Sequence, residues 1–259
     1  MLALPDERQS LAVALFATAD YMAVRASFYD EATDLDAAYR QLMKKQSTMI
    51  ERHQAARDNI LRNLPSGRSR GRDNIQRTVL WNTFVDMLRL IDTLVATRTD
   101  YALLRRALAG QDVLIFMRDA LMKLSQAVDH IAQDISRTNP TQYRSGVKAE
   151  LRAIEYEIEQ RRRPGRKQPD PEVIALMVQV LRRLRNAANV VDRMAEHTQA
   201  RPDIRPTGDL RIDQTLQRFI SKPTLRFGLI TSNLRLDSPY CRHAIRVALA
   251  AALGLIIIG

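Results

Sequence analysis

Apolar side chains recur at alternating steps of three and four residues along most of the chain, and this periodicity restricts the fold more than any other feature. The clearest run comprises Leu114, Met117, Leu121, Leu124, Val128, Ile131 and Ile135. Steps of three and four place side chains on one face of an α-helix. No segment alternates with the period of two that indicates a strand, and the sequence has no Asn-Gly or Asp-Gly hairpin turn. The sequence therefore predicts an all-α protein.

Six further segments show the same helical periodicity. They span residues 12–29, 34–64, 73–97, 101–109, 147–158 and 170–195. Asp34 and Asp170-Pro171 are expected to begin helices as N-terminal caps, and Gly110 is expected at the C′ position of the short helix. The first segment is expected to bury a single stripe, formed by Ala12, Leu15, Ala19, Met22, Ala26 and Tyr29.

Long amphipathic helices joined by short loops pack in antiparallel pairs at shallow angles. We therefore predict an elongated antiparallel bundle of about seven helices in residues 1–200. The sequence has no repeat of fixed length, so a solenoid is the less favoured architecture. His53 shares a stripe with apolar residues of the second helix and is interpreted as a hydrogen-bonded core residue rather than a metal ligand.

The C-terminal residues are apolar on every side of a helix. From Val247 to Gly259 the sequence has no charged or strongly polar side chain. A helix that is apolar on all faces must be surrounded by protein or by lipid. A buried core helix is one interpretation, because such helices typically carry apolar runs of about 10 to 14 residues. We favour lipid, since the other helices are expected to be apolar on one stripe only, and predict the start of a truncated transmembrane helix at residues 237–259.

The segment between the bundle and this predicted span differs from both. Prolines and glycines are spread through residues 201–236, which we interpret as a juxtamembrane linker. Near the span Asp237 is the one acidic residue beside four basic ones, Lys222, Arg226, Arg235 and Arg242. Basic residues beside a span favour the cytoplasm. The soluble part is therefore expected on the cytoplasmic side.

Basic residues outnumber acidic ones and give the chain a net charge of +11. Such a charge attracts nucleic acid or anionic lipid headgroups. The densest basic cluster is Arg161, Arg162, Arg163, Arg166 and Lys167. Its first interpretation is a solvated helix end, because cations are favourable there and Glu157 and Glu159 each lie four residues before an arginine. A surface that faces anionic lipid or nucleic acid is the alternative.

Three ionisable residues lie at the start of the predicted span: Arg242, His243 and Arg246. Arg242 and Arg246 are four residues apart, so they share one helix face. Such side chains either extend to lipid headgroups or line the path of a transported anion. The sequence leaves both interpretations open.

No sequence pattern supports catalysis or cofactor binding. The four histidines are far apart, and Cys241, the one cysteine, has no second ligand at zinc spacing. The sequence lacks the serine-nucleophile, zinc-protease and dinucleotide-binding signatures. We therefore expect no enzymatic activity, no cofactor and no bound metal.

Two segments of the chain resemble a known family. The first runs from Asn233-Leu234 through Ser238-Pro239 to an Arg242-His243-Ala244-Ile245-Arg246 helix start, and the second is Leu11 to Tyr29. They resemble the start of the second membrane bundle, and the first helix after the N-terminal membrane bundle, in the fusaric acid resistance (FUSC) superfamily, particularly its YccS-like inner-membrane members. Tyr240-Cys241 departs from the family pattern, in which a more apolar pair is expected.

The resemblance implies a bacterial inner-membrane efflux transporter with two membrane bundles separated by a cytoplasmic helical domain. It implies an organic acid as substrate, with aromatic carboxylic acids as one class. The domain would couple the two bundles within a homo-oligomer that contacts membrane lipid. Ser238, Pro239, Arg242, His243 and Arg246 match the family motif and would lie in the substrate path or where the chain enters the membrane.

Two other functions remain as alternatives. One is a basic helical protein that binds nucleic acid, and the other is a peripheral membrane scaffold that uses its basic clusters alone. The few aromatic residues and the lack of a recognised nucleic-acid-reading motif argue against the first, so nucleic acid is not an expected partner.

Overall fold

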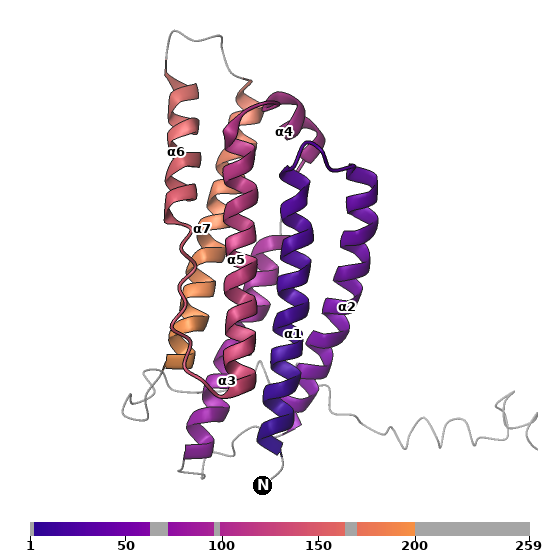
Figure 1. Ribbon diagram of the computed structural model, residues 1–259, viewed down its shortest axis with the longest axis vertical. Helices are drawn as coiled ribbons and strands as arrows, with labels where there is room; N and C mark the ends of the chain where they lie inside the picture. Colours follow the sequence, from indigo (N-terminus) through magenta and orange to yellow (C-terminus); the bar gives the residue numbers. More distant parts are fainter. Residues whose placement is uncertain (1–2, 63–71, 96–98, 164–169, 200–259) are drawn as a thin grey trace, which may run out of the picture. The chain divides into compact units, whose positions relative to one another are not determined.

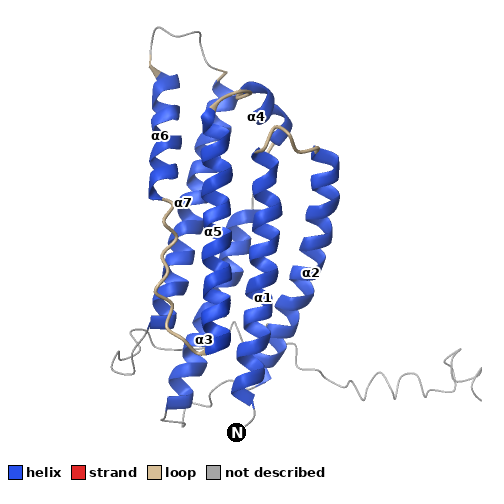
Figure 2. Ribbon diagram, in the orientation of Figure 1, coloured by secondary structure: helices blue, strands red, loops and turns tan. Residues whose placement is uncertain are grey.

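The computed structural model describes residues 3–62, 72–95, 99–163 and 170–199. Within these ranges the chain forms seven α-helices and one short 3-10 helix, and no strand (Figure 2). The elements are α1 (Ala3–Ala26), η1 (Ser27–Tyr29), α2 (Leu35–Arg62), α3 (Arg72–Val95), α4 (Tyr101–Ala107), α5 (Asp112–Arg137), α6 (Lys148–Arg162) and α7 (Pro171–Gln199). The predicted all-α fold class and the number of helices are confirmed.

The helices form an antiparallel bundle. Figure 1 shows that consecutive long helices run in opposite directions, as short connections require. α1 packs against α2, α5 and α3, and α7 packs against α3, α5, α6 and α4. All of these helices belong to one compact unit. The predicted linker (201–236) and membrane segment (237–259) lie outside the described residues.

Side chains at the helix starts make the expected capping hydrogen bonds. The Asp34 carboxylate accepts from the backbone N–H of Asp36 at 3.1 Å, and the Asp170 carboxylate accepts from that of Glu172 at 3.0 Å. Both satisfy N–H groups that have no partner within the helix. Gly110 has the expected positive φ of 71°, but the predicted C′ position is wrong. Because α4 already ends at Ala107 with Leu108 as its C-cap, Gly110 lies one residue farther along.

The apolar stripe of α5 is buried as predicted. All seven residues that define its periodicity are buried. A buried hydroxyl brings α5 close to α1, since Ser125 Oγ donates a hydrogen bond to the carbonyl oxygen of Ala19 at 2.7 Å. Small residues at this contact let the two helices approach closely.

All six residues of the stripe predicted for α1 are buried, but the expectation that α1 buries this stripe alone is wrong, because the helix is enclosed on several sides. Leu11, Ala12, Ala14 and Leu15 are all fully buried, although neighbouring positions on a helix point in different directions. The cause is the packing of α2, α5 and α3 around α1. Apolarity on all faces is therefore not confined to the C-terminal segment, contrary to expectation.

The composition of α1 would also suit a membrane span. The helical stretch Asp6–Tyr29 is long and apolar enough to cross a bilayer, with a mean hydropathy of 1.3, and 67% of its most apolar window is buried inside the bundle. It is the one such helix among the residues that the structure describes. Since neighbouring helices cover it, α1 is a core helix of the bundle.

Candidate functional site

Two arginines and three tyrosines meet inside the bundle where α1 and η1 approach α4 and α7. These residues, here called the arginine–tyrosine cluster, are Tyr21, Arg25, Tyr29, Tyr101 and Arg183, and each is at least nine-tenths buried. Charged side chains are rarely buried so fully. The cluster is therefore the least conventional part of the core and the first candidate for a functional site.

Local structure explains how the cluster is assembled. Tyr21 and Arg25 are one turn apart on α1, and the Arg25 guanidinium donates to the Tyr21 hydroxyl at 2.8 Å. η1 continues the chain from α1 and adds Tyr29. Asp100 caps α4 by accepting from the backbone N–H of Leu103 at 2.8 Å, which fixes Tyr101 at the start of that helix.

Ring contacts connect the aromatic residues of the cluster, and a threonine holds Arg183 in place. The rings of Tyr29 and Tyr101 meet edge to face with their centroids 5.3 Å apart, and Phe28 packs on Tyr101 at 4.9 Å. From α7, the Arg183 guanidinium donates to the Thr99 hydroxyl at 2.8 Å. The cluster thus joins helices from the beginning, middle and end of the bundle.

Burial and like charge both act on the arginines. Burial lowers the pKa of Arg183, and the positive charge of Arg25 lowers it further against the opposing effect of the Tyr29 and Tyr101 phenols. Burial also lowers the pKa of Arg25, but its tyrosine neighbours outweigh this and leave that pKa raised. Burial raises the pKa of Tyr29 well above its usual value, so its phenol stays neutral. At neutral pH the cluster therefore contains two guanidinium cations and the neutral phenol of Tyr29.

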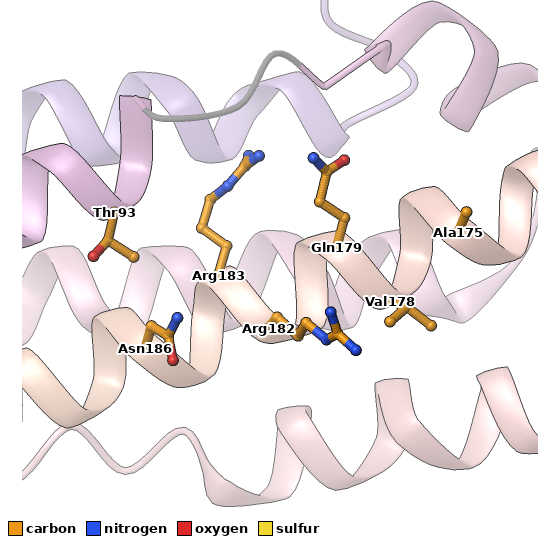
Figure 3. A pocket seen from close by; sticks show the side chains of 7 residues that line it. All are labelled: Thr93, Ala175, Val178, Gln179, Arg182, Arg183 and Asn186. Carbon is orange, nitrogen blue, oxygen red and sulfur yellow. The ribbon is translucent and has the colours of Figure 1, made fainter.

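A pocket of about 450 Å³ opens beside Arg183. It is lined by one side of α7 and the end of α3, through Thr93, Ala175, Val178, Gln179, Arg182, Arg183 and Asn186. Figure 3 shows Gln179 and Arg183 projecting from α7 in the same direction, whereas Arg182 projects in another. Arg183 therefore belongs both to the lining of this pocket and to the arginine–tyrosine cluster.

A second charged group lies between α3 and α7, centred on the buried carboxylate of Asp86. Arg193 Nε donates to both carboxylate oxygens at 3.1 and 3.0 Å, and Arg89 Nη1 donates to Oδ1 at 3.0 Å. His197 Nε2 lies 3.1 Å from Oδ2. Burial alone would raise the pKa of Asp86, but the hydrogen bonds from His197 and Arg193 hold it below its usual value. These contacts indicate that the Asp86 carboxylate has a structural role and holds α3 against α7.

His53 is a core residue, as predicted. Its Nε2 lies 2.8 Å from the Thr18 hydroxyl of α1, which is also 2.8 Å from the carbonyl oxygen of Ala14. Burial lowers the pKa of His53 to about 4, so the ring is neutral at pH 7. Among the residues that the structure describes, no group of three or more His, Cys, Asp or Glu side chains could hold a metal ion.

The predicted basic cluster is only partly described. Arg161 pairs with Glu157 at 2.9 Å, as expected for residues four apart on a helix. Arg163 lies beyond the last helical residue with an extended backbone (φ −68°, ψ 134°), and no ion pair joins it to Glu159 in the described ranges. Arg162 and Arg163 are exposed. Arg166 and Lys167 lie outside the described residues.

The residues predicted at the membrane also fall outside the described part of the chain: Ser238, Pro239, Arg242, His243 and Arg246. Their role stays a prediction. Sequence reasoning missed the arginine–tyrosine cluster and Asp86, because charged residues are usually read as exposed. A signal was present for Arg183, which lies three residues after Val180 on the buried face of α7.

Comparison with known proteins identifies the family. The family model described as FUSC-like inner membrane protein yccS matches residues 2–194. The chain belongs to this family. No curated protein and no solved structure matches the chain. The FUSC-like match spans nearly the whole described bundle, from α1 into the last turns of α7. FUSC-like membership confirms the predicted recognition and gives the protein an inner-membrane, transport-related role.

Proposed function

We propose that this chain contains the cytoplasmic helical domain of an inner-membrane FUSC-type efflux transporter, followed by the start of a second membrane bundle. The observation that carries the proposal is the FUSC-like match over residues 2–194, which coincides with a packed helical bundle. An inner-membrane protein with such a domain needs membrane segments elsewhere. In our proposal, residues 237–259 begin one of them.

The polar contacts of α1 support its assignment to the soluble domain. Thr18 of α1 bonds to His53 of α2, and the buried Glu7 lies 3.8 Å from Arg77 of α3. Ser125 of α5 bonds to the backbone of α1. In a bilayer these polar groups would lose their partners at a cost of several kcal/mol (about 2–7 each). Helix packing within the bundle therefore suits α1 better than lipid does.

The sequence after Asp237 supports the membrane part of the proposal. Val247 to Gly259 is apolar throughout, and the basic residues before it favour a cytoplasmic location for the bundle. Within this scheme the bundle couples two membrane bundles in a homo-oligomer. Arg242 and Arg246 share a helix face and would guide an organic acid, with aromatic carboxylates as one substrate class.

Fractionation tests the membrane anchor. Residues 1–259 and a version ending at Leu236 are expressed side by side, and membranes are separated from soluble protein. The longer chain should require detergent for extraction, whereas the shorter one should remain in the soluble fraction. If the longer chain stays soluble without detergent, the membrane assignment of residues 237–259 is wrong.

Cys241 provides a topology test, because it is the one cysteine in the sequence. A membrane-impermeant maleimide should label the protein in inside-out vesicles and should fail to label it in right-side-out vesicles until detergent is added. The reverse pattern would place this end of the span, and the bundle with it, outside the cytoplasm. A C241S variant serves as the unlabelled control.

A further inference from the structure

Exposed apolar side chains are concentrated on two neighbouring helices of the bundle. Within the described ranges eight large hydrophobic side chains are exposed, and six of them lie on α2 and α3: Tyr39, Met43, Ile50, Ile75, Leu88 and Val95. Met43 is 70% exposed, the largest fraction among the eight. Extended apolar surface on a folded protein marks a place where another molecule binds. The α2–α3 side of the bundle is therefore a candidate interface.

α3 carries two apolar faces. Its buried face comprises Leu80, Phe84, Met87 and Leu94. The other face, here called the outer stripe, comprises Trp81, Val85, Leu88, Asp92 and Val95. Its residues recur at steps of four and three, which is the spacing of a helix that packs along a second helix. Leu88 and Val95 are nonetheless exposed, so the described part of the chain leaves this stripe partly uncovered.

α2 presents a smaller apolar surface of its own. It lies at one edge of the bundle, with α1 as its main neighbour (Figure 1). Met43 and Ile50 are seven residues apart, which is about two helical turns, so they lie on one face of α2. Both are exposed, whereas His53, which bonds to Thr18 of α1, is buried. α2 therefore buries one face against α1 and leaves part of a second apolar face exposed.

Charged residues beside these two surfaces have opposite signs. Asp92 is the one charged residue of the outer stripe, and Arg40 and Lys44 lie close to Met43 near the start of α2. All three charged residues are exposed, and no ion pair joins any of them to another described residue. A contact between the outer stripe and the start of α2 in another molecule would pair these charges.

We propose that this side of the bundle binds a second copy of the chain, with the outer stripe of α3 in one copy against Met43 and Ile50 of α2 in the other. In a two-fold dimer this contact is made twice, because each copy offers both surfaces. The inference deepens the homo-oligomer of the proposed function, on which it rests, by naming the surface through which the copies associate.

Ring contacts place the start of α2 and the end of α3 at the same end of the bundle. Tyr39 of α2 packs on Phe28 with ring centroids 4.7 Å apart, and Phe28 packs at 4.9 Å on Tyr101, which lies shortly after α3. Lys44 and Asp92 therefore lie at similar levels, each within a few turns of that end. A two-fold axis parallel to the helices preserves these levels and brings Lys44 of one copy to Asp92 of the other. Copies anchored side by side in one membrane can have such an axis.

Pairing of the two outer stripes with each other is less favourable. It would place Asp92 of one copy beside Asp92 of the other, and like charges in a partly buried contact repel. Pairing of α3 with α2 replaces this repulsion by attraction to Lys44 and Arg40. Because these charges keep contact with water, they select the matching surface more than they add affinity. The apolar side chains supply the affinity.

Cross-linking between differently tagged copies tests the contact. Both copies carry all 259 residues and C241S, so that each introduced cysteine is the only one. One copy carries M43C and the other L88C, and a short bismaleimide is added to the membrane and the soluble fractions of cells that express both. A product with both tags is expected. I115C replaces L88C as the matched control, because Ile115 is similarly exposed but lies on α5, and it should give no such product.

The fraction that contains the product separates this inference from the proposed function. A product in the soluble fraction alone would contradict the membrane assignment and leave the interface intact. A chain that is found in the membrane fraction but gives no product would contradict the interface and leave the membrane assignment intact. An equal yield with I115C would also contradict the interface, because it would indicate random collision.

A substitution on the outer stripe measures its contribution to self-association. The full chain is purified in non-ionic detergent, and its mass is determined by light scattering over a range of protein concentrations. L88E should weaken association at least about tenfold, because the dimer would bury an unpaired carboxylate. Y156E is the matched control, since Tyr156 is exposed on α6, and it should change association by less than about twofold. Circular dichroism verifies that both variants are folded.

A charge exchange tests the pairing of α2 with α3. K44D and D92K should each weaken association about three- to tenfold, because each places like charges opposite one another. The double variant K44D/D92K restores opposite signs and should return to within about twofold of the unaltered chain.

Three results would overturn the proposal: a chain that is monomeric at all concentrations, unchanged association in L88E, and a double charge variant that associates no better than the single ones. In a monomeric chain, the reaction of M43C with maleimide distinguishes the remaining occupants. A protected cysteine would indicate that another part of the same chain covers α2, and a reactive one would indicate a different partner protein. Both outcomes exclude a second copy.

Discussion

The carboxylate of Asp86 on α3 and the guanidinium of Arg193 on α7 form a hydrogen-bonded ion pair across the bundle, with Nε 3.0 Å from Oδ2. The Asp86 side chain is 1% exposed, whereas the Arg193 side chain is 42% exposed. The pair is therefore buried at its acidic end and hydrated at its basic end. The ion pair therefore joins α3 to α7 while only its carboxylate is removed from water.

Replacing Asp86 by Asn should destabilise the bundle. The D86N side chain keeps its shape but loses the negative charge that Arg193, Arg89 and His197 surround. We expect a loss of about 1–3 kcal/mol in the free energy of unfolding, measured by urea denaturation. D92N, the same change at an exposed position of α3, is the control and should cost less than about 0.5 kcal/mol. Equal effects of the two substitutions would show that the Asp86 contacts do not stabilise the protein.

The same carboxylate should make stability fall in strong acid. The pKa of Asp86 is lowered in the folded state, so its contribution is present above the unfolded pKa of about 3.9. That contribution is lost as the pH falls from about 3.9 through the folded pKa. Urea unfolding between pH 5 and 2 should therefore show a smaller decline for D86N than for the unaltered protein. Parallel curves would contradict the assignment.

His53 should produce a separate loss of stability at mildly acidic pH. Its pKa is about 4 in the folded protein, against 6.5 for an unburied histidine. As the pH falls below 6.5, His53 becomes protonated in the unfolded chain but stays neutral in the folded protein until about pH 4. Folding therefore becomes less favourable between pH 6.5 and 4. The difference corresponds to about 3 kcal/mol. The measurement is the free energy of unfolding at intervals from pH 7.5 to 4.

H53Q should remove most of the decline between pH 6.5 and 4, while retaining a polar group that can bond to Thr18. H130Q is the matched control, because His130 is exposed and stacks on Tyr143 at the surface. It should leave the decline in place. A decline that persists in H53Q and disappears in H130Q would refute the role given to His53.

Thr138 ends α5 in a left-handed conformation, with φ of 64°, which a β-branched residue adopts at a cost of about 1–2 kcal/mol. T138G should raise the free energy of unfolding by about 0.5–1 kcal/mol, since this gain exceeds the loss of the exposed hydrogen bond from Arg8. S136G, two residues earlier and inside the helix, should instead lower stability by about 0.5–1 kcal/mol. Thermal melting of the two variants should thus move in opposite directions.

Ser125 marks the close contact between α1 and α5. S125L should destabilise the bundle by about 1–3 kcal/mol, because the larger side chain has no space against Ala19 and the hydrogen bond to its carbonyl is lost. Q126L, at the adjacent exposed position, tests whether an added leucine on α5 is harmful in itself. Comparable destabilisation by Q126L would remove the argument for close packing at Ser125.

Much of the fold could be predicted from sequence because most helices bury one face and expose the other. The periodic residues of α5 identify both the helix and its buried side, and Asp34 and Asp170 identify helix starts. The buried positions of α1 were harder to predict. A helix that is surrounded by other helices has no polar, exposed face, so its apolar residues do not show a clear periodicity. Its burial on several sides depends on neighbours that the local sequence does not specify.

The candidate site could not be predicted for a different reason. Arg183 and Asp86 are stabilised by partners that lie far from them in the sequence, Thr99 ahead of α4 and Arg193 on α7. Charge by itself indicates exposure, and local pattern gives no sign that partners converge. The Glu157–Arg161 pair was predictable because both residues lie on one helix. The second expected pair, between Glu159 and Arg163, does not form because α6 ends at Arg162.

The enclosure of α1 by its neighbours has a consequence for biosynthesis. Within the bundle, α1 is synthesised before its largest partner, α5, and three further helices are translated between them. During that interval α1, which is long and apolar enough to be taken for a membrane span, is not yet packed against α5. Thr18, Glu7 and Arg25, which the finished bundle satisfies internally, would during this time weaken the segment's attraction to the bilayer and so keep the nascent domain in water.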